Sequence, residues 1–426
     1  MPSPMQPLTP YSDGATPLSS WASYSVFLFF AFMLGTPRGY ALGAVLLIVG
    51  SIYYLATRPA ISLTRDDKIL VALMLVIFVV GAISWRYHGN DLQSLDLPSR
   101  YLLAIPIFLL MLAHPVKLSW LNAGFIVGGI AAGTVAAWER YSLGAERAAG
   151  FTGGIQFGDL ALMMAVFCVA AFVASDWLFR KPALWRAASL LGVAGGSYAS
   201  IMSGARGGWV AIPFVMLVFC AAYMRRSNMK WVAATFVGII AASVIAVYTV
   251  PMVESRFELA VKDVQMYQRG NTESSLGARF EVWRALTVII PQKPYMGWSE
   301  AGYKEEKERL VTSGAFTSSV TKLANTHNTF LELWVLQGML GLVPVLALLA
   351  LSLVYFVRQL RSADPVAQYL AVCGVSLVGC FVIFSQTQIM LGRNNTLLFF
   401  IISLITFWGA LRWQIKTQPV HNAHAL

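Results

Sequence analysis

The sequence is poor in charge. Only 12% of its 426 residues are Asp, Glu, Lys or Arg, whereas ordinary soluble domains carry about 25%. Hydrophobic residues make up 57%, and the mean hydropathy is +0.64. Such a chain cannot cover its surface with polar groups, which argues against a soluble multi-domain enzyme. We therefore predict an all-α polytopic membrane protein. In such a protein the net charge of +11 concerns membrane orientation and does not indicate nucleic acid as a partner.

Cysteine is also scarce. All four cysteines fall inside apolar runs: Cys168, Cys220, Cys373 and Cys380. None belongs to a Cys-x-x-Cys or Cys/His cluster, so the sequence predicts neither a disulfide framework nor a metal site. The first twenty residues contain no basic residue and no apolar core. They are therefore interpreted as a polar tail, residues 1–20, and not as a cleaved signal peptide.

Long apolar runs are abundant. A membrane-spanning helix needs about 20 mainly apolar residues, and about twelve stretches approach that length. They lie near residues 21–35, 41–57, 69–86, 101–113, 118–137, 157–177, 185–203, 208–224, 231–251, 328–357, 369–388 and 395–414. We predict transmembrane helices 1–9 within 21–251, a loop domain at 252–326, helices 10–12 within 327–415, and a second tail at 416–426.

Basic residues are divided unequally between the two sets of loops. Fourteen fall on the side of the termini: Arg58, Arg65, Lys68, Lys117, Arg180, Lys181, Arg186, Arg225, Arg226, Lys230, Arg358, Arg361, Arg412 and Lys416. Seven fall in the opposite short loops: Arg38, Arg86, Arg100, Arg140, Arg147, Arg206 and Arg393. The positive-inside rule predicts that both termini are cytoplasmic and that residues 252–326 lie on the outer face.

The seven outer residues are all arginine, a choice that topology alone does not require. Arginine presents a planar fork of donors that suits phosphate oxygens. Snorkelling anchors explain any single one about as well, but the set favours a diphosphate held at the outer interface. The spacing in 252–326 predicts amphipathic helices at 254–270 and 275–290 and a charged helix at 300–314. Lying flat on the membrane, such helices would roof a site at headgroup level.

Four places could carry chemistry. His327 and Asn328 stand at the mouth of an apolar helix, where Asn can cap but an imidazole cannot; His327 is a candidate general base or an ordinary interfacial histidine. Arg206 is flanked by glycines, which let a backbone approach a ligand, although a tight turn with a snorkelling arginine would look the same.

The other two places lie in outer loops. Arg279 and Trp283 share a helix face, and Arg284 points elsewhere; ordinary loop residues are the alternative. In the segment 146–161, Arg147, several glycines and Gln156 form a donor-rich loop suited to phosphate or sugar.

Taken together, these residues resemble a known superfamily. The pattern His-Asn-x-x-Leu followed by Gly is met by His327, Asn328, Leu331 and Gly338. It follows Arg279-x-x-x-Trp283 and a Pro-x-x-Gly element, Pro294 to Gly297, and further upstream a Ser-x-x-Arg-Gly turn, Ser203 to Gly207. Over residues 140–345 the order and membrane side of these motifs resemble the O-antigen ligases and O-antigen polymerases, GT-C-like glycosyltransferases of the bacterial inner membrane.

The resemblance implies a specific reaction. Similar ligases move an O-antigen glycan from undecaprenyl diphosphate to a sugar hydroxyl of lipid A–core oligosaccharide on the periplasmic face, with no metal and no cofactor. Matched by position, His327, Arg206 and Arg279 would be catalytic. We predict Arg147, Gln156, Arg284, Asn328 and Trp283 as substrate-binding residues. The loop before the sixth span departs from the pattern, with Gly-Gly-Ile-Gln in place of Asn-Pro-Asn, which puts donor contacts there in question.

Three other functions stay open on the sequence. An O-antigen polymerase would use the same donor and a second lipid-linked glycan as acceptor. An oligosaccharyltransferase acting on protein usually carries a further C-terminal region. A lipid-linked glycan transporter, from a different class, tends to show internal repeats and charges in mid-membrane, and we find no convincing repeat and almost no charge within the spans.

Overall fold

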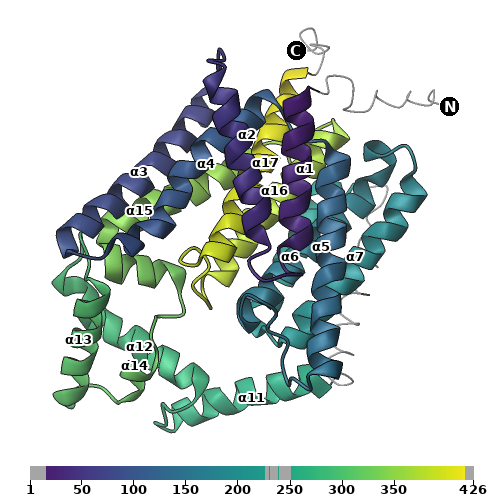
Figure 1. Ribbon diagram of the computed structural model, residues 1–426. Coiled ribbons are helices and arrows are strands. Elements are labelled where there is room, and N and C mark those ends of the chain that lie inside the picture. The colour runs from purple at the N-terminus through teal and green to yellow at the C-terminus, as the bar shows by residue number, and fades with distance from the viewer. Residues whose placement is uncertain (1–15, 226–229, 231–237, 239–250, 418–426) are drawn as a thin grey trace.

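The computed structural model describes residues 16–225, 230, 238 and 251–417, and those residues form helices and connecting loops. The bundle (Figure 1) contains α1 (Pro17–Phe32), α2 (Tyr40–Ala56), α3 (Arg65–His88), α4 (Asp96–Ala113), α5 (Leu118–Ala137), α6 (Gly154–Leu178), α7 (Pro182–Ser203), α8 (Arg206–Trp209), α9 (Ala211–Tyr223), α15 (Thr329–Val357), α16 (Pro365–Phe384) and α17 (Asn394–Thr417). The segment between α9 and α15 adds α11 (Pro251–Gln268), α12 (Ser275–Ile289), α13 (Glu300–Thr312) and α14 (Ser319–Lys322). Short helical turns lie at Leu92–Leu95, Trp138–Ser142 and Ile290–Gln292.

The prediction of an all-α polytopic membrane protein is confirmed. Within the described part of the chain, eight helices are long and apolar enough to cross a membrane. Of the other predicted spans, α1 and α2 are apolar but only 16 and 17 residues long, and α7 is a helix that does not meet the same measure of length and hydropathy. The predicted span at 231–251 falls almost entirely outside the described residues.

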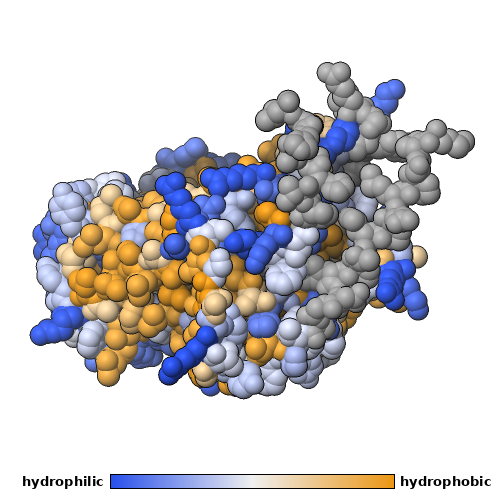
Figure 2. All heavy atoms as spheres, turned by 90° about the horizontal axis from the view of Figure 1, so that it is seen from above, coloured by the Kyte–Doolittle hydropathy of each residue, from blue (hydrophilic) through white to orange (hydrophobic). Residues whose placement is uncertain are grey.

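Helices α6, α16 and α17 form the centre of the bundle, where most of their side chains are buried. Helices at the edge instead expose apolar residues, among them Val45 and Val49 of α2 and Leu75 and Val79 of α3. A view from the end where α1 begins and α17 ends shows hydrophobic residues over a broad area (Figure 2). An apolar exterior of this kind is what a bilayer requires of the helices that face it.

Helix α7 joins the bundle through glycines. A Cβ at Gly133 would lie 2.6 Å from the Cα of Gly195, and one at Gly129 would lie 2.6 Å from the carbonyl oxygen of Gly192. The backbones of α5 and α7 therefore touch, as small residues permit in membrane helices. We call these four glycines the α5–α7 glycine seam. On its other side α7 packs closely against α6, where a Cβ at Gly196 would lie 2.6 Å from Ala161 O.

Helices α11 to α14 lie together at the end of the bundle opposite the start of α1 and the end of α17 (Figure 1). We call this segment, 251–326, the outer domain. Its small core contains Leu286 and Ile289 of α12 and Tyr303 and Leu310 of α13. The expected amphipathic helices at 254–270, 275–290 and 300–314 correspond to α11, α12 and α13.

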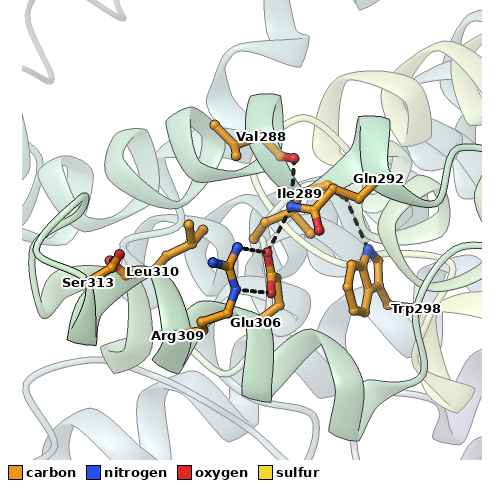
Figure 3. Close-up of polar contacts among 8 residues, drawn as sticks. All are labelled: Val288, Ile289, Gln292, Trp298, Glu306, Arg309, Leu310 and Ser313. Carbon is orange, nitrogen blue, oxygen red and sulfur yellow. Dashed lines mark hydrogen bonds and ion pairs between the residues drawn. The ribbon is translucent and has the colours of Figure 1, made fainter.

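Polar contacts join α12 to α13 (Figure 3). The Glu306 carboxylate accepts hydrogen bonds from Gln292 Nε2 at 2.8 Å and from Arg309 Nη2 at 2.6 Å. Trp298 donates its indole N–H to Ile289 O at 3.2 Å. The Gln292–Glu306 bond joins the turn after α12 to α13, and the Trp298 bond joins the loop between the two helices to the end of α12.

The outer domain is attached to the bundle at a break in α15. Gly338 has φ 66° and ψ −164° in the middle of that helix, a conformation that is almost restricted to glycine. The turn from Pro294 to Gly297 enters the break: Met339 N–H bonds Pro294 O at 2.8 Å, and Trp298 N–H bonds Val335 O at 2.7 Å. We call this contact the Gly338 junction. It explains why a Pro-x-x-Gly element and a distant glycine occur together in the sequence.

Candidate active site

Arg206 lies at a sharp turn between two membrane helices. Helix α7 ends at Ser203, the next residue, Gly204, has φ 61°, and Arg206 begins α8 two residues after Gly204. Gly207 packs against Thr387, because a Cβ there would lie 2.2 Å from the Thr387 hydroxyl oxygen. Gly208 similarly approaches Asp159, a fully buried residue of α6 whose carboxyl oxygens have no hydrogen-bond partner among the described residues. Both glycines are needed for the turn to fit.

A cavity of about 330 Å³ lies between this turn and α12, and we call it the arginine cavity. Arg147, Arg206 and Arg279 all line it, together with Ile155, Gly204, Ala205, Gly207, Val210, Ser275, Leu276 and Thr387. Arg147 donates from Nε to Ser203 O at 2.8 Å and from Nη2 to Gly204 O at 3.4 Å. Burial lowers the pKa of Arg279, and the positive charge of Arg206 lowers it further. Three cations thus meet around one space that suits an anion.

A larger open groove of about 580 Å³ runs along α11, lined by Glu258, Val261, Lys262, Gln265, Met266 and Arg269. It lies on one face of a single helix and contains none of the predicted site residues. The arginine cavity is the better candidate because residues from four separate parts of the chain converge on it.

His327 stands beside Arg279 at the start of α15. Its backbone has φ 52°, a left-handed conformation that is uncommon for a residue with a Cβ. Burial lowers the pKa of His327 to about 4, with the positive charges of Arg279 and Arg393 adding to the effect and a hydrogen bond to the Gln388 side chain opposing it. The imidazole is therefore neutral at pH 7, and its Nδ1 is buried without a hydrogen-bond partner in the described part of the chain.

The loop after α16 forms a wall of the site that was missed in the sequence. Thr387 lines the arginine cavity, and Gln386 accepts a hydrogen bond from Asn328 Nδ2 at 3.1 Å. The loop is joined to α15 because Thr329 donates its N–H to Ser385 O at 2.8 Å and its hydroxyl to Gln388 O at 2.9 Å. The loop could have been found from the four consecutive polar residues, 385–388, which interrupt a predicted apolar span.

Several of the predicted binding residues form hydrogen bonds or ion pairs within the protein itself. Asn328 caps α15, because its Oδ1 accepts from the N–H groups of Phe330 and Leu331. Trp283 donates its indole N–H to Thr326 O at 2.8 Å. Arg284 pairs with Glu281 at 2.7 Å and does not line the arginine cavity.

Gln156, 3% exposed, follows Ile155 of the cavity wall. Its Nε2 has no partner among the described groups. The binding roles of Asn328, Trp283, Arg284 and Gln156 stay predictions.

The seven outer arginines are not equivalent. Arg147 and Arg206 line the cavity, and Arg393 lies close enough to His327 to affect its pKa. Arg100 is bound to Asp96 and Asn394. Across the described residues, no three His, Cys, Asp or Glu side chains gather closely enough to hold a metal ion.

The fold and the cavity define an all-α polytopic membrane protein with a cationic site at one end of its bundle. The family model described as O-antigen ligase matches residues 191–346, a range that contains Arg206, Arg279 and His327. Over this range the chain is similar to the O-antigen ligase family.

Two relatives extend the comparison. An O-antigen ligase of Escherichia coli (strain K12) is 24% identical over 214 residues, 47% of this chain and 51% of that protein. An uncharacterized protein of Haemophilus influenzae is 26% identical over 386 residues, 90% of this chain and 96% of that protein.

Proposed function

We propose that this chain is an inverting glycosyltransferase of the bacterial inner membrane. It moves an O-antigen glycan from undecaprenyl diphosphate to a sugar hydroxyl of lipid A–core oligosaccharide and so completes lipopolysaccharide. The reaction takes place at the periplasmic end of the bundle, requires no metal or other cofactor, and involves the lipid bilayer that carries both substrates. The observation that carries the proposal is the convergence of Arg147, Arg206 and Arg279 on one cavity beside His327.

The arginine cavity suits a diphosphate leaving group. When the bond between the anomeric carbon and the phosphate oxygen breaks, negative charge grows on the diphosphate. Guanidinium forks bind such oxygens bidentately, and a preorganised donor aimed at developing charge is typically worth about 3–4 kcal/mol. Arg206 and Arg279 would supply this stabilisation directly, and Arg147 reaches the same space.

His327 would accept the proton of the attacking hydroxyl. The hydroxyl oxygen bonds to the anomeric carbon on the face opposite the diphosphate, which inverts that centre in one step. A base must be unprotonated before the reaction, and the low pKa of His327 ensures this at pH 7. The negative charge of a bound donor offsets the nearby arginines, so the imidazolium formed after proton transfer is stabilised when the donor is in place.

A deletion strain tests the reaction class. Lipopolysaccharide from the strain is separated on a gel, with and without the gene restored on a plasmid. A ligase predicts core without O-antigen while lipid-linked polymer accumulates. A core that carries a single repeat unit would instead indicate a polymerase. With purified protein, donor and acceptor, transfer should continue fully in EDTA; strict dependence on added Mg²⁺ would contradict the arginine-based reaction.

A further inference from the structure

The loop that carries His327 is held by side chains from two helices. The buried Thr326 makes the central contacts: Glu332 of α15 accepts its N–H at 2.8 Å, and Trp283 of α12 donates to its carbonyl oxygen at 2.8 Å. The Thr326 hydroxyl donates to Asn328 O at 2.8 Å and accepts Asn328 N–H at 3.2 Å. The residues on both sides of His327 are therefore fixed.

A buried lysine holds the beginning of the same loop. Lys307 of α13 is 4% exposed and donates from Nζ to Leu323 O at 2.8 Å. Its ammonium group also lies 4.6 Å from the centre of the Tyr303 ring. The Glu332 side chain interacts electrostatically with it, because the negative charge of Glu332 opposes the lowering of the Lys307 pKa that burial causes. Lys307 and Glu332 thus lie close enough behind the loop for their charges to interact.

This arrangement matches a strained backbone. A non-glycine residue in the left-handed region carries a cost and persists only where its surroundings determine it fully. His327, with φ 52°, is such a residue, and its own N–H is taken by Asn325 Oδ1 at 3.1 Å. If Glu332 were lost, the buried Thr326 N–H would have no acceptor, and the loop could relax to ordinary dihedral angles.

We propose that Glu332 is a positioning residue for His327: by accepting the Thr326 N–H, it holds the strained loop and thereby fixes the place of the imidazole. The expected effect of Glu332 on glycan transfer rests on the proposed function. Its expected effect on the conformation of the His327 loop does not. Glu332 does not line the arginine cavity. Lys307 and Trp283 support the same loop from α13 and α12.

Two substitutions at Glu332 separate positioning from general stability. Glu332→Gln keeps an oxygen that can accept the Thr326 N–H, so kcat should stay within about twofold of wild type. Glu332→Leu keeps the size but removes the acceptor, and kcat should fall about 10- to 100-fold, as small misplacements of a catalytic group do, with little change in KM for the lipid-linked donor. Glu306→Leu is the matched control: its carboxylate is also buried, but it bonds Gln292 and Arg309 and not the His327 loop.

Hydrogen–deuterium exchange of residues 323–330 in the purified protein measures how firmly the loop is held, and it needs no substrate. The Thr326 amide should exchange slowly in wild type, Glu332→Gln and Glu306→Leu, and at least about tenfold faster in Glu332→Leu, because a buried amide that loses its acceptor opens more readily. An unchanged exchange rate of the Thr326 amide in Glu332→Leu would overturn the proposal. Faster exchange in Glu332→Leu together with a normal kcat would overturn it as well. If wild type lacked transfer activity, the proposed function would fail, whereas exchange would still decide whether Glu332 holds the loop.

Discussion

Two of the contacts between the outer domain and the bundle are built in opposite ways. At the Gly338 junction, backbone lies against backbone: a Cβ on Gly338 would come within 2.1 Å of Tyr295 O. At the arginine cavity, about 330 Å³ stays open between guanidinium groups from the bundle and from α12. Like charges across that space repel, as the lowered pKa of Arg279 beside Arg206 indicates. The comparison suggests that the closely packed junction holds the domain in place so that the cavity can stay open and cationic.

The largest effect should come from the base beside the cavity. His327→Ala removes the group proposed to accept the proton and should lower transfer by about 10²- to 10⁴-fold without changing thermal stability. Turnover is measured with purified protein, lipid A–core and lipid-linked glycan. His114→Ala is the control, since His114 follows α4 at the opposite end of the bundle and contacts Thr16. Near-normal turnover of His327→Ala would remove His327 as the base.

The cavity arginines should come next. Arg206→Lys and Arg279→Lys keep the charge but replace a bidentate fork with a point donor, so each should lose about 10²- to 10³-fold in kcat. Arg309→Lys is the control, because Arg309 belongs to the outer domain but pairs with Glu306 away from the cavity. Full activity in both cavity variants would mean that positive charge alone suffices there, and the leaving-group role of the guanidinium fork would be lost.

A substitution at the Gly338 junction should lower the stability of the protein. Gly338→Ala forces a side chain into backbone atoms and into a dihedral region that only glycine adopts freely, at a cost above about 3 kcal/mol. Gly314→Ala is the matched control: Gly314 also has a positive φ, 71°, but no atom lies within 4 Å of its Cβ position, so its cost should be about 1–2 kcal/mol. Thermal unfolding in detergent compares the two. Equal losses would show that the close packing at the junction contributes nothing.

The smallest effect should be a shift along the pH axis. Because the imidazole acts in its neutral form, kcat/KM should be lost only as pH falls through about 4, the pKa of His327 in the free protein. Arg393→Gln removes a positive neighbour, which makes protonation easier, raises the pKa and moves the acid limb to higher pH. Arg86→Gln, an exposed outer arginine that does not affect the His327 pKa, is the control. If the acid limb of the pH profile stayed in place in Arg393→Gln, Arg393 would not influence the pKa of the base.

The features that could be predicted from the sequence are those set by the surrounding solvent and by the local pattern of apolar residues. The lengths of apolar runs predicted eleven of the described helices near their observed places, because a span has to satisfy its backbone within one segment. Arg206 was singled out because an ionisable group at a membrane boundary is costly. Arg279 was singled out because it shares a helix face with Trp283, and His327 because an imidazole at a helix start adds nothing to capping. That Arg279 lies between the other two, near Arg206 in the cavity and near His327, came from the structure.

Two features could not be predicted because distant hydrogen bonds decide them. The predicted span 369–388 continued to Gln388, but α16 ends at Phe384, where the polar loop turns to bond Asn328 and Thr329. Likewise, Gly338 sits within the predicted span 328–357, which the sequence predicts as one helix. Its break exists because carbonyl groups more than forty residues earlier in the chain, at Pro294 and Tyr295, bond the N–H groups that follow it.

The α5–α7 glycine seam has a consequence for the reactive end of the molecule. From Gly195, α7 rises 1.5 Å per residue and reaches Ser203, eight residues on, about 12 Å from the seam, just before the turn that presents Arg206. A single methyl group added in the apolar interior would push α7 sideways and displace that turn. The position of Arg206 thus depends on contacts about 12 Å away, where four glycines without side chains let two backbones touch.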